Sequence, residues 1–292
     1  MRGPDVSGRG RERWHVVVLS GAFTAIFTAY LALQNLQSSL NQESGLGIIG
    51  LSAMYACIII SGILAPAVLR LVGEKRTLVI AFLSHIVYTA TNFYPRFETL
   101  LPSSILLGLT AGPMWTAQSV YLADRAVSYA GRILADEHVI LTRFNGIFFA
   151  MYETTQITGN LISSLVLQQG NYSEHESNAT IKYCGRSDCP REVNATKIEE
   201  PETRVVYILM GVFLALDVIG VLLTVILLPP LTQASKAAKV PVLKSVMACG
   251  RGLADVNLAL LVPLIMFMAM EQGILWTDYT KVNKSSFICM YM

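Results

Sequence analysis

Nine polar residues lie inside long apolar stretches of the sequence, where a polar atom is costly unless it finds a partner. They are Glu153, Gln156 and Asn160, then His85, Tyr88 and Asn92, then Trp115 with Gln118, and finally Asp217. The first two groups are spaced by three and four residues, and Trp115 and Gln118 are three apart. Such spacings put side chains on one face of a helix, so the sequence predicts three polar stripes.

Two kinds of chemistry suit these stripes. They could line a solute pathway through a helix bundle, in which Glu153 or His85 relays protons. They could equally be hydrogen bonds between helices, each contributing about 0.6 kcal/mol. Asp217 has the same two interpretations, a structural carboxyl that is protonated or hydrogen-bonded or a functional one, and the sequence leaves both open.

Other reaction chemistry has little support in the sequence. It contains no Gly-rich phosphate loop, nucleophile elbow or HExxH motif, and no Cys or His spacing typical of zinc. We therefore expect no enzyme activity, no cofactor and no metal. A net charge of +2 without a run of like charges argues against nucleic acid as a partner.

The elements that must position these residues are membrane helices. Charged residues make up 14% of the chain, against about 25% in soluble proteins. A helix needs roughly 20 mostly apolar residues to cross a bilayer, and seven such stretches occur. They cover residues 15–33, 47–69, 77–94, 100–122, 144–167, 205–229 and 258–276. The sequence thus predicts an all-α membrane protein, a polytopic helical bundle in contact with lipids.

The distribution of Lys and Arg predicts the orientation, because these residues gather on the cytosolic side. With a cytosolic N-terminus (1–14), most of the 22 basic residues fall in inner segments. They are Arg2, Arg9, Arg11, Arg13, Arg70, Lys75, Arg76, Arg125, Arg132, Arg143, Lys236, Lys239, Lys244 and Arg251. The predicted organisation is a six-span bundle (15–229), a cytosolic linker (230–257), a seventh span (258–276) and an outer tail (277–292), most simply in the plasma membrane.

The connection 168–204 carries signs of an outer loop. It contains three N-glycosylation sequons, at Asn171, Asn178 and Asn194, and these are modified only on the lumenal side. Cys184 and Cys189 lie in the same loop without apolar neighbours, so we expect a disulfide between them in an oxidising compartment rather than two free thiols. In the fourth apolar stretch, Gly108 and Gly112 form a small-xxx-small pattern that predicts close helix packing.

Several longer segments resemble the Unc-ninety-three family of the major facilitator superfamily. They are Leu33-Gln-Asn-Leu-Gln-Ser-Ser-Leu40, Pro102-Ser-Ser-Ile-Leu-Leu-Gly108, Pro113-Met-Trp-Thr-Ala-Gln118, Phe144-Asn-Gly-Ile-Phe-Phe149 and Gly159-Asn-Leu-Ile-Ser-Ser-Leu165. The resemblance implies the six-helix N-terminal half of a major facilitator fold plus a seventh transmembrane helix. Because the family has about twelve spans, it also implies a truncated chain. The usual facilitator signature is reduced to Arg70-Leu-Val-Gly-Glu-Lys-Arg76, which lacks its Asp.

Two functions follow from the sequence. The resemblance implies a non-enzymatic accessory or regulatory subunit that binds another integral membrane protein, such as a potassium channel subunit. The polar stripes at Glu153, His85 and Gln118 imply, as the alternative, a secondary transporter of a small solute. A transporter-like interior can persist in a protein that no longer transports, so the sequence does not separate them.

The outer loop gives a testable prediction. Replacing Asn171, Asn178 and Asn194 together by Gln should abolish the mobility shift that endoglycosidase produces on the protein from animal cells. Asn178 and Asn194 should be the better acceptors, because Asn171 follows the apolar stretch too closely for the modifying enzyme to reach it easily. An unchanged mobility of the triple variant would contradict an outer location of this loop.

Overall fold

The structure, a computed structural model, describes residues 6–40, 46–168, 203–231, 247, 252 and 255–274. Within these residues the chain is entirely helical apart from short connections. The helices are α1 (Val6–Leu40), α2 (Leu46–Val72), α3 (Glu74–Thr91), α4 (Phe97–Ile133), α5 (Glu137–Gln168), α6 (Thr203–Leu222) and α8 (Val256–Ile274), and a short π-helix, η2 (Leu223–Leu227), continues α6.

Each of the seven apolar stretches coincides with one helix. Three helices of the described chain are long and apolar enough to cross a membrane: the Gly10–Leu36 part of α1, α2, and α6 continued by η2. In α8 the apolar part, Val256–Glu271, is shorter. The chain is therefore a multipass membrane protein by length and composition, and the crossing of α3, α4, α5 and α8 stays a prediction.

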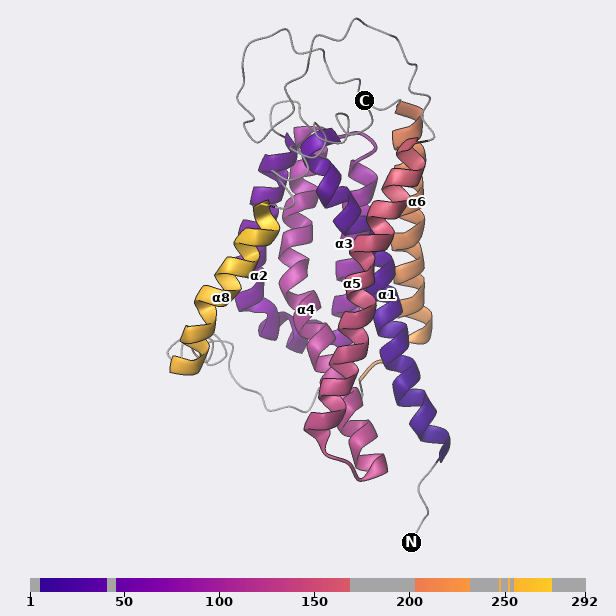
Figure 1. Cartoon of the computed structure of the whole chain (residues 1–292), viewed down its shortest axis with the longest axis vertical. Helices are drawn as coiled ribbons and strands as arrows, with labels where there is room; N and C mark the ends of the chain where they lie inside the picture. The colour runs from indigo at the N-terminus through magenta and orange to yellow at the C-terminus, as the bar shows by residue number, and fades with distance from the viewer. Residues whose placement is uncertain are drawn as a thin grey trace, which may run out of the picture.

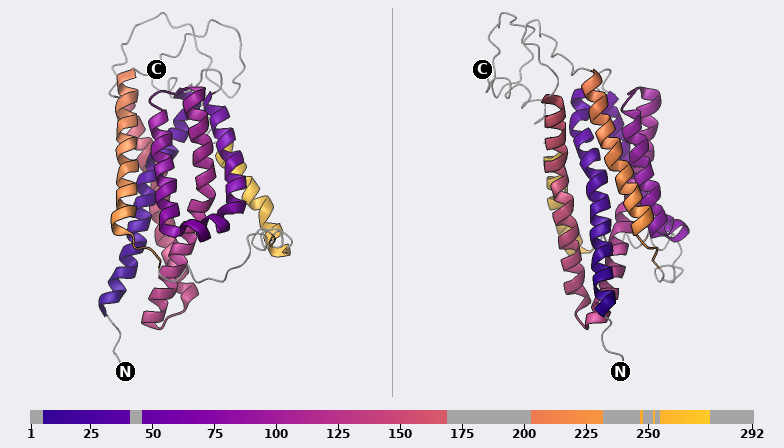
Figure 2. Two further views of the ribbon diagram at one scale, coloured as in Figure 1. Left: turned by 180° about the vertical axis from the view of Figure 1, so that it is seen from behind. Right: turned by 90° about the vertical axis from the view of Figure 1, so that its right-hand side faces the viewer.

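Helices α1 to α6 stand side by side and alternate in direction (Figures 1 and 2). The closest pairs are α2 with α4, α1 with α5 and α3 with α4, and α1 also contacts α6. We call the end at which α1 begins the N-end; the α2–α3 and α4–α5 turns and the residues after η2 lie there (Figure 2). Helix α8 stands apart from this bundle, and its described side chains are almost all exposed.

Several helices extend beyond the stretches predicted from hydropathy, and α1 does so at both ends. At the N-end α4 continues to Ile133 and α5 begins at Glu137. The search for apolar runs stopped at charged residues, but a charged side chain does not end a helix when it reaches water or a partner. Helix α4 ends at its C-cap Leu134, whose φ of 54° is left-handed, the conformation in which helices commonly terminate.

Aromatic side chains fill the centre of the bundle. The ring of Phe23 in α1 lies 5.2 Å from that of Phe82 in α3, 5.6 Å from Trp115 in α4 and 5.1 Å from Phe148 in α5. Phe23, Phe82 and Phe148 are fully buried. Edge-to-face and tilted contacts of this kind add to the stabilisation from burial, so four helices share one aromatic core.

Helices α2 and α4 approach closely at two glycines. A Cβ on Gly108 would lie 2.3 Å from the carbonyl oxygen of Met54, and one on Gly112 would lie 2.4 Å from the backbone nitrogen of Gly62. Ser61 joins the two helices, because its hydroxyl donates to the Gly108 carbonyl at 2.8 Å and accepts from the Gly112 N–H at 3.2 Å. The small-xxx-small pattern is thus confirmed as a packing feature.

This contact predicts that Gly112→Ala destabilises the bundle by roughly 1–3 kcal/mol, because the added methyl overlaps a backbone that cannot move alone. Gly131→Ala is the matched control in the same helix, since its Cβ would meet no atom within 4 Å. Thermal unfolding of the purified protein in detergent, followed by size-exclusion fluorescence, measures both. Equal melting temperatures for the two variants would contradict the close approach.

Candidate functional site

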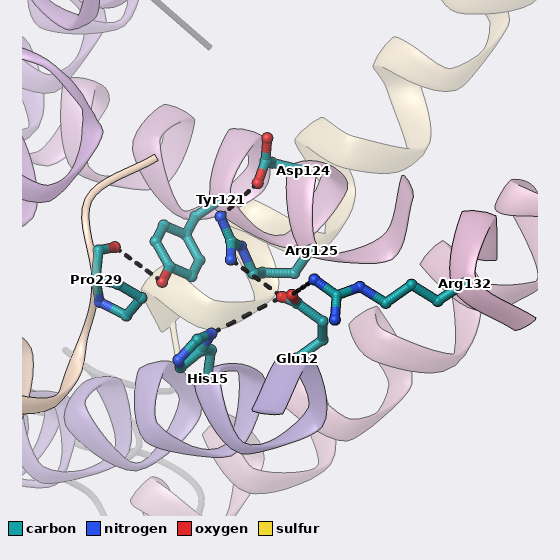
Figure 3. A network of polar contacts seen from close by, with 7 residues as sticks. All are labelled: Glu12, His15, Tyr121, Asp124, Arg125, Arg132 and Pro229. Carbon is teal, nitrogen blue, oxygen red and sulfur yellow. Dashed lines mark hydrogen bonds and ion pairs between the residues drawn. The ribbon is translucent and has the colours of Figure 1, made fainter. Parts of the chain in front are cut away.

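A buried carboxylate organises the N-end of the bundle. Glu12 in α1 is 1% exposed, and its two oxygens are paired with two arginines of α4 (Figure 3). Arg125 Nη1 lies 3.0 Å from Oε2, and Arg132 Nη2 lies 3.4 Å from Oε1. His15 Nδ1 is 3.8 Å from Oε2, beyond hydrogen-bond distance. Removing a carboxylate from water is costly, and this one is balanced by two guanidinium groups.

Arg125 extends this network to the chain that leaves η2. Its Nη2 donates to Asp124 at 2.7 Å, and its guanidinium lies 5.3 Å from the centre of the Tyr121 ring. The Tyr121 hydroxyl in turn donates to the carbonyl oxygen of Pro229 at 3.1 Å (Figure 3). The network therefore ties together the start of α1, the N-end half of α4 and the segment that follows η2.

Two further contacts strengthen the same end. The Arg13 guanidinium donates a hydrogen bond to the Tyr129 hydroxyl and lies 5.1 Å from the centre of that ring. From the first turn of α3, Lys75 donates to the carbonyl oxygen of Val225 at 2.8 Å. That carbonyl belongs to the π-helix, in which the regular α-helical hydrogen-bond pattern is interrupted. The side chains at this end make ion pairs and hydrogen bonds. These contacts position the helices relative to one another.

His85, one of the predicted relay residues, is closed off by neighbouring rings. It is 3% exposed, its Nδ1 is 2.9 Å from the carbonyl oxygen of Ala81, and the rings of Phe27 and Tyr30 lie within 5.7 Å and 5.5 Å of it. Tyr88 follows on the same helix, Asn92 is the residue that caps the end of this helix, and both are buried as well. The α3 stripe thus faces the packed interior.

Asp217 and Gln118 are buried at separate places in the bundle. Asp217 is fully buried, and its Oδ2 accepts a hydrogen bond of 2.6 Å from Thr89 across the contact between α6 and α3. Gln118 is 2% exposed and accepts a bond of 3.1 Å from Ser119. Among the described residues, Asp217 Oδ1 and Gln118 Nε2 are buried without a hydrogen-bond partner.

Trp115 contributes to the aromatic core rather than to a polar stripe. Its ring lies 5.4 Å from Tyr152 and 5.3 Å from Phe27. The aromatic contacts and the partial burial of Trp115 indicate a packing role for this side chain. Trp115 and Gln118 share a helix face, as their spacing predicted, but the two side chains have different partners.

The α5 stripe, made of Glu153, Gln156 and Asn160, is the most exposed of the three predicted polar stripes. Asn35 of α1 donates its side-chain amide to Asn160 Oδ1 at 3.0 Å and to Gln156 Oε1 at 3.4 Å. Gln156 is half-buried, whereas Asn160 and Glu153 are exposed. The structure therefore brings two of the three α5 residues to one partner on α1. It leaves Glu153 without an ion pair among the described residues.

Neither hydropathy nor the spacing of motifs singles out the N-end network. Glu12 lies between Arg11 and Arg13, and Arg125 is 113 positions away, so their pairing is a product of the fold. The one available signal is an Asp124-Arg125 pair that directly follows an apolar stretch. The predicted glycosylation sites Asn171, Asn178 and Asn194, and the predicted Cys184–Cys189 bridge, lie outside the described residues.

The buried pairing predicts a large effect of one substitution. Glu12→Gln should lower the free energy of unfolding by about 1.5–3 kcal/mol, because it removes the buried carboxylate that pairs with Arg132 and with Arg125, of which only Arg125 keeps a second described partner, Asp124. Glu137→Gln removes an exposed carboxylate at the same end and should change stability by less than about 0.5 kcal/mol. Unfolding of both variants by increasing SDS in mixed micelles tests this. A Glu12 variant as stable as the control would show that the pair contributes nothing.

Comparison with known proteins agrees with a multipass membrane protein. The family model described as "Ion channel regulatory protein UNC-93" matches residues 38–284. The chain is 35% identical over 284 residues to "Protein unc-93 homolog A" of Xenopus laevis, covering 93% of this chain and 61% of that protein. To the Homo sapiens protein of the same name it is 32% identical over 278 residues, with the same coverage of both chains.

A more distant relative carries a more specific name. "Putative potassium channel regulatory protein unc-93" of Caenorhabditis elegans is 28% identical over 275 residues, covering 90% of this chain and 39% of that protein. The chain thus spans about three fifths of the length of the vertebrate relatives named above. The family model covers well over half of the chain, and on this match the chain belongs to the UNC-93 family.

Proposed function

We propose that this chain is a non-enzymatic accessory subunit that binds another integral membrane protein, an ion channel, and modulates it. The observation that carries the proposal is the match of residues 38–284 to a family described by ion channel regulation. A potassium channel is the first partner to test, because the name of the Caenorhabditis elegans relative specifies that class. The whole relatives are longer, so the activity is proposed for the shared region.

The geometry supports a scaffold rather than a reaction centre. At the N-end, Glu12 and Arg125 are held in fixed ion pairs, and Tyr121 holds the segment after η2. An accessory subunit needs a bundle whose helices keep their relative positions while a partner binds, and these contacts supply that rigidity. We propose that all seven helices cross the plasma membrane as part of a major facilitator fold, with the N-end in the cytosol.

Charge and helix direction support this orientation. The N-end holds Arg11, Arg13, Lys75, Arg125 and Arg132, whereas the described turn between α3 and α4 at the opposite end contains only one basic residue, Arg96. Such an excess is typical of the cytosolic side. The same orientation puts the segment between α5 and α6 outside, where its sequons would be glycosylated and Cys184 and Cys189 would form a disulfide.

Solute transport has less support. The predicted relay residue His85 is enclosed by aromatic rings, and Asp217 bonds to Thr89 between α3 and α6. Buried polar groups with such partners join helices to one another. The open α5 stripe is the one predicted polar group that could face a pathway, and its exposure also suits contact with a partner.

The proposed function predicts a change in channel current. Potassium channels of several subfamilies should be expressed in oocytes, each with and without co-expression of this chain (residues 1–292). At least one channel should shift its open–closed equilibrium by about fivefold or more, the lower end of usual coupling between two sites. Two-electrode voltage clamp measures the shift, and surface biotinylation confirms equal amounts of channel at the membrane.

Two outcomes would contradict this proposal. One is an unchanged current for every channel although the chain reaches the surface. The other is saturable uptake of a solute that Glu153→Gln abolishes, which would establish transport. Glu137→Gln serves as the control variant in both assays, since this carboxylate lies at the exposed start of α5.

A further inference from the structure

One carboxyl group inside the bundle is buried with a single hydrogen bond. Asp217 of α6 is fully buried, and its Oδ2 accepts the 2.6 Å hydrogen bond from Thr89 of α3. Its Oδ1 is enclosed as well and has no hydrogen-bond partner among the described residues. Because the whole side chain is buried within the bundle, no other protein and no further segment of chain reaches it while the helices keep these positions.

The packing of α6 against α1 closes this position on both sides. Towards the N-end, a Cβ on Gly220 would lie 3.0 Å from the carbonyl oxygen of Ala22, so the two backbones approach closely there. In the opposite direction, Phe213 is fully buried in an apolar cluster that includes Ala29 of α1. Asp217 therefore lies between a close helix contact and an apolar cluster, and neither offers it a hydrogen bond.

The helices around Asp217 provide no permanent cation at its depth. Helix α6 contacts α1, α3 and α5. In the described parts of these four helices, no Lys or Arg follows Arg13 in α1, Arg76 in α3, Arg143 in α5 or Arg204 in α6. Deeper than the N-end network, their other titratable side chains are Tyr30, His85, Tyr88, Tyr152, Glu153 and Tyr207.

His85 is the one base in that set, and it does not act as the counter-charge. Its Nδ1 lies 2.9 Å from the carbonyl oxygen of Ala81 in its own helix. Its ring packs against the rings of Phe27 and Tyr30 of α1, whereas the described hydrogen bond of Asp217 goes to Thr89. The buried carboxyl thus has a hydroxyl donor and no described positive partner.

The cost of burial decides the protonation state. An ionised carboxylate that keeps one hydroxyl donor has lost most of its solvation, and buried groups avoid this cost by becoming neutral. A neutral carboxyl with one unpaired hydroxyl loses only an ordinary hydrogen bond, which is the smaller penalty. The neutral form also keeps the contact with Thr89. With the proton on Oδ1 of Asp217, Oδ2 remains the carbonyl oxygen that accepts from the Thr89 hydroxyl.

We propose that Asp217 is a proton-binding site, and that the proton on its Oδ1 holds α6 against α3 and α1. The ligand is one proton taken from water as the bundle forms, because an Asp in water is ionised near neutral pH. Loss of this proton creates a charge that water must reach, which requires α6 to move away from α3. The contact between α3 and α6 is therefore sensitive to pH, whether or not the chain modulates a channel.

The stability of an isosteric variant tests this site. The full chain and Asp217→Asn should be unfolded by SDS in mixed micelles over a series of pH values. Above about pH 5, where an ordinary Asp is ionised, the original chain keeps its proton only when folded, so its stability should fall as the pH rises. The variant carries no such proton. The ratio of the two unfolding equilibrium constants should therefore change by about tenfold per pH unit in favour of Asp217→Asn.

Asp136→Asn is the matched control. Asp136 is exposed, and its Oδ1 accepts a hydrogen bond of 2.7 Å from the backbone N–H of His138, which the Asn side-chain oxygen can also accept. This carboxylate is ionised above pH 5 in the folded and the unfolded chain. The ratio of the unfolding constants of the original chain and Asp136→Asn should stay constant over the same pH series.

Infrared spectroscopy of the folded chain detects the proton directly. The carbonyl stretch of a protonated carboxyl should be present near neutral pH, absent in Asp217→Asn and retained in Asp136→Asn. Thr89→Val should keep this band to a higher pH than the original chain, because removing the hydroxyl donor disfavours the ionised form. This variant tests the site independently if Asp217→Asn fails to fold.

Three results would overturn the inference. A pH-independent ratio for Asp217→Asn would show that Asp217 has the same protonation in the folded and unfolded states. A ratio that changes in the opposite direction, with no band that depends on Asp217, would show an ionised carboxylate. Stabilisation of the original chain by Na⁺ that Asp217→Asn abolishes would identify a metal cation, rather than a proton, as the ligand.

Discussion

The pairing of Glu12 with Arg125 and Arg132 fixes the position of α1 against α4, and much of the structure depends on α1. This helix contacts each of α2 to α6, so its register decides which residues of those helices meet. A shift of α1 by one turn would separate Asn35 from Asn160, and would move Thr28 away from Gly159. In a membrane, where apolar contacts alone give little drive for helices to associate, such a charged anchor has particular weight.

Polar groups in this bundle fall into two kinds with different physical roles. Those between α2 and α4 or between α3 and α6, such as Ser61 and the Thr89–Asp217 pair, are buried and bonded across a helix contact. They join helices whose backbones approach closely. Those of the α5 stripe, Gln156 and Asn160, bond to Asn35 of α1 yet stay partly or fully exposed. The first kind completes the packing between helices, and the second lies at the surface of the described bundle.

The sequence predicted the helices well because hydropathy is a local property. Every apolar stretch became a helix, and the spacing of Gln156 and Asn160 correctly put them on one face. The ends were less accurate: α4 runs to Ile133 because Arg125 and Arg132 find a partner in Glu12, which hydropathy cannot anticipate. Partners such as Asn35 or Thr89 could not be predicted either, since they depend on which helices become neighbours.

The distance in sequence between Glu12 and its arginines has a consequence for biosynthesis. The chain emerges from the ribosome from its N-terminus, so α1 is complete long before Arg125 and Arg132 are made. Until then, burial of Glu12 would be unfavourable, and the start of α1 is best accommodated at the aqueous surface beside Arg11 and Arg13. Arrival of α4 then supplies the counter-charge and draws this end of α1 into its final place. Assembly of the bundle is therefore ordered, with the fourth helix completing the placement of the first.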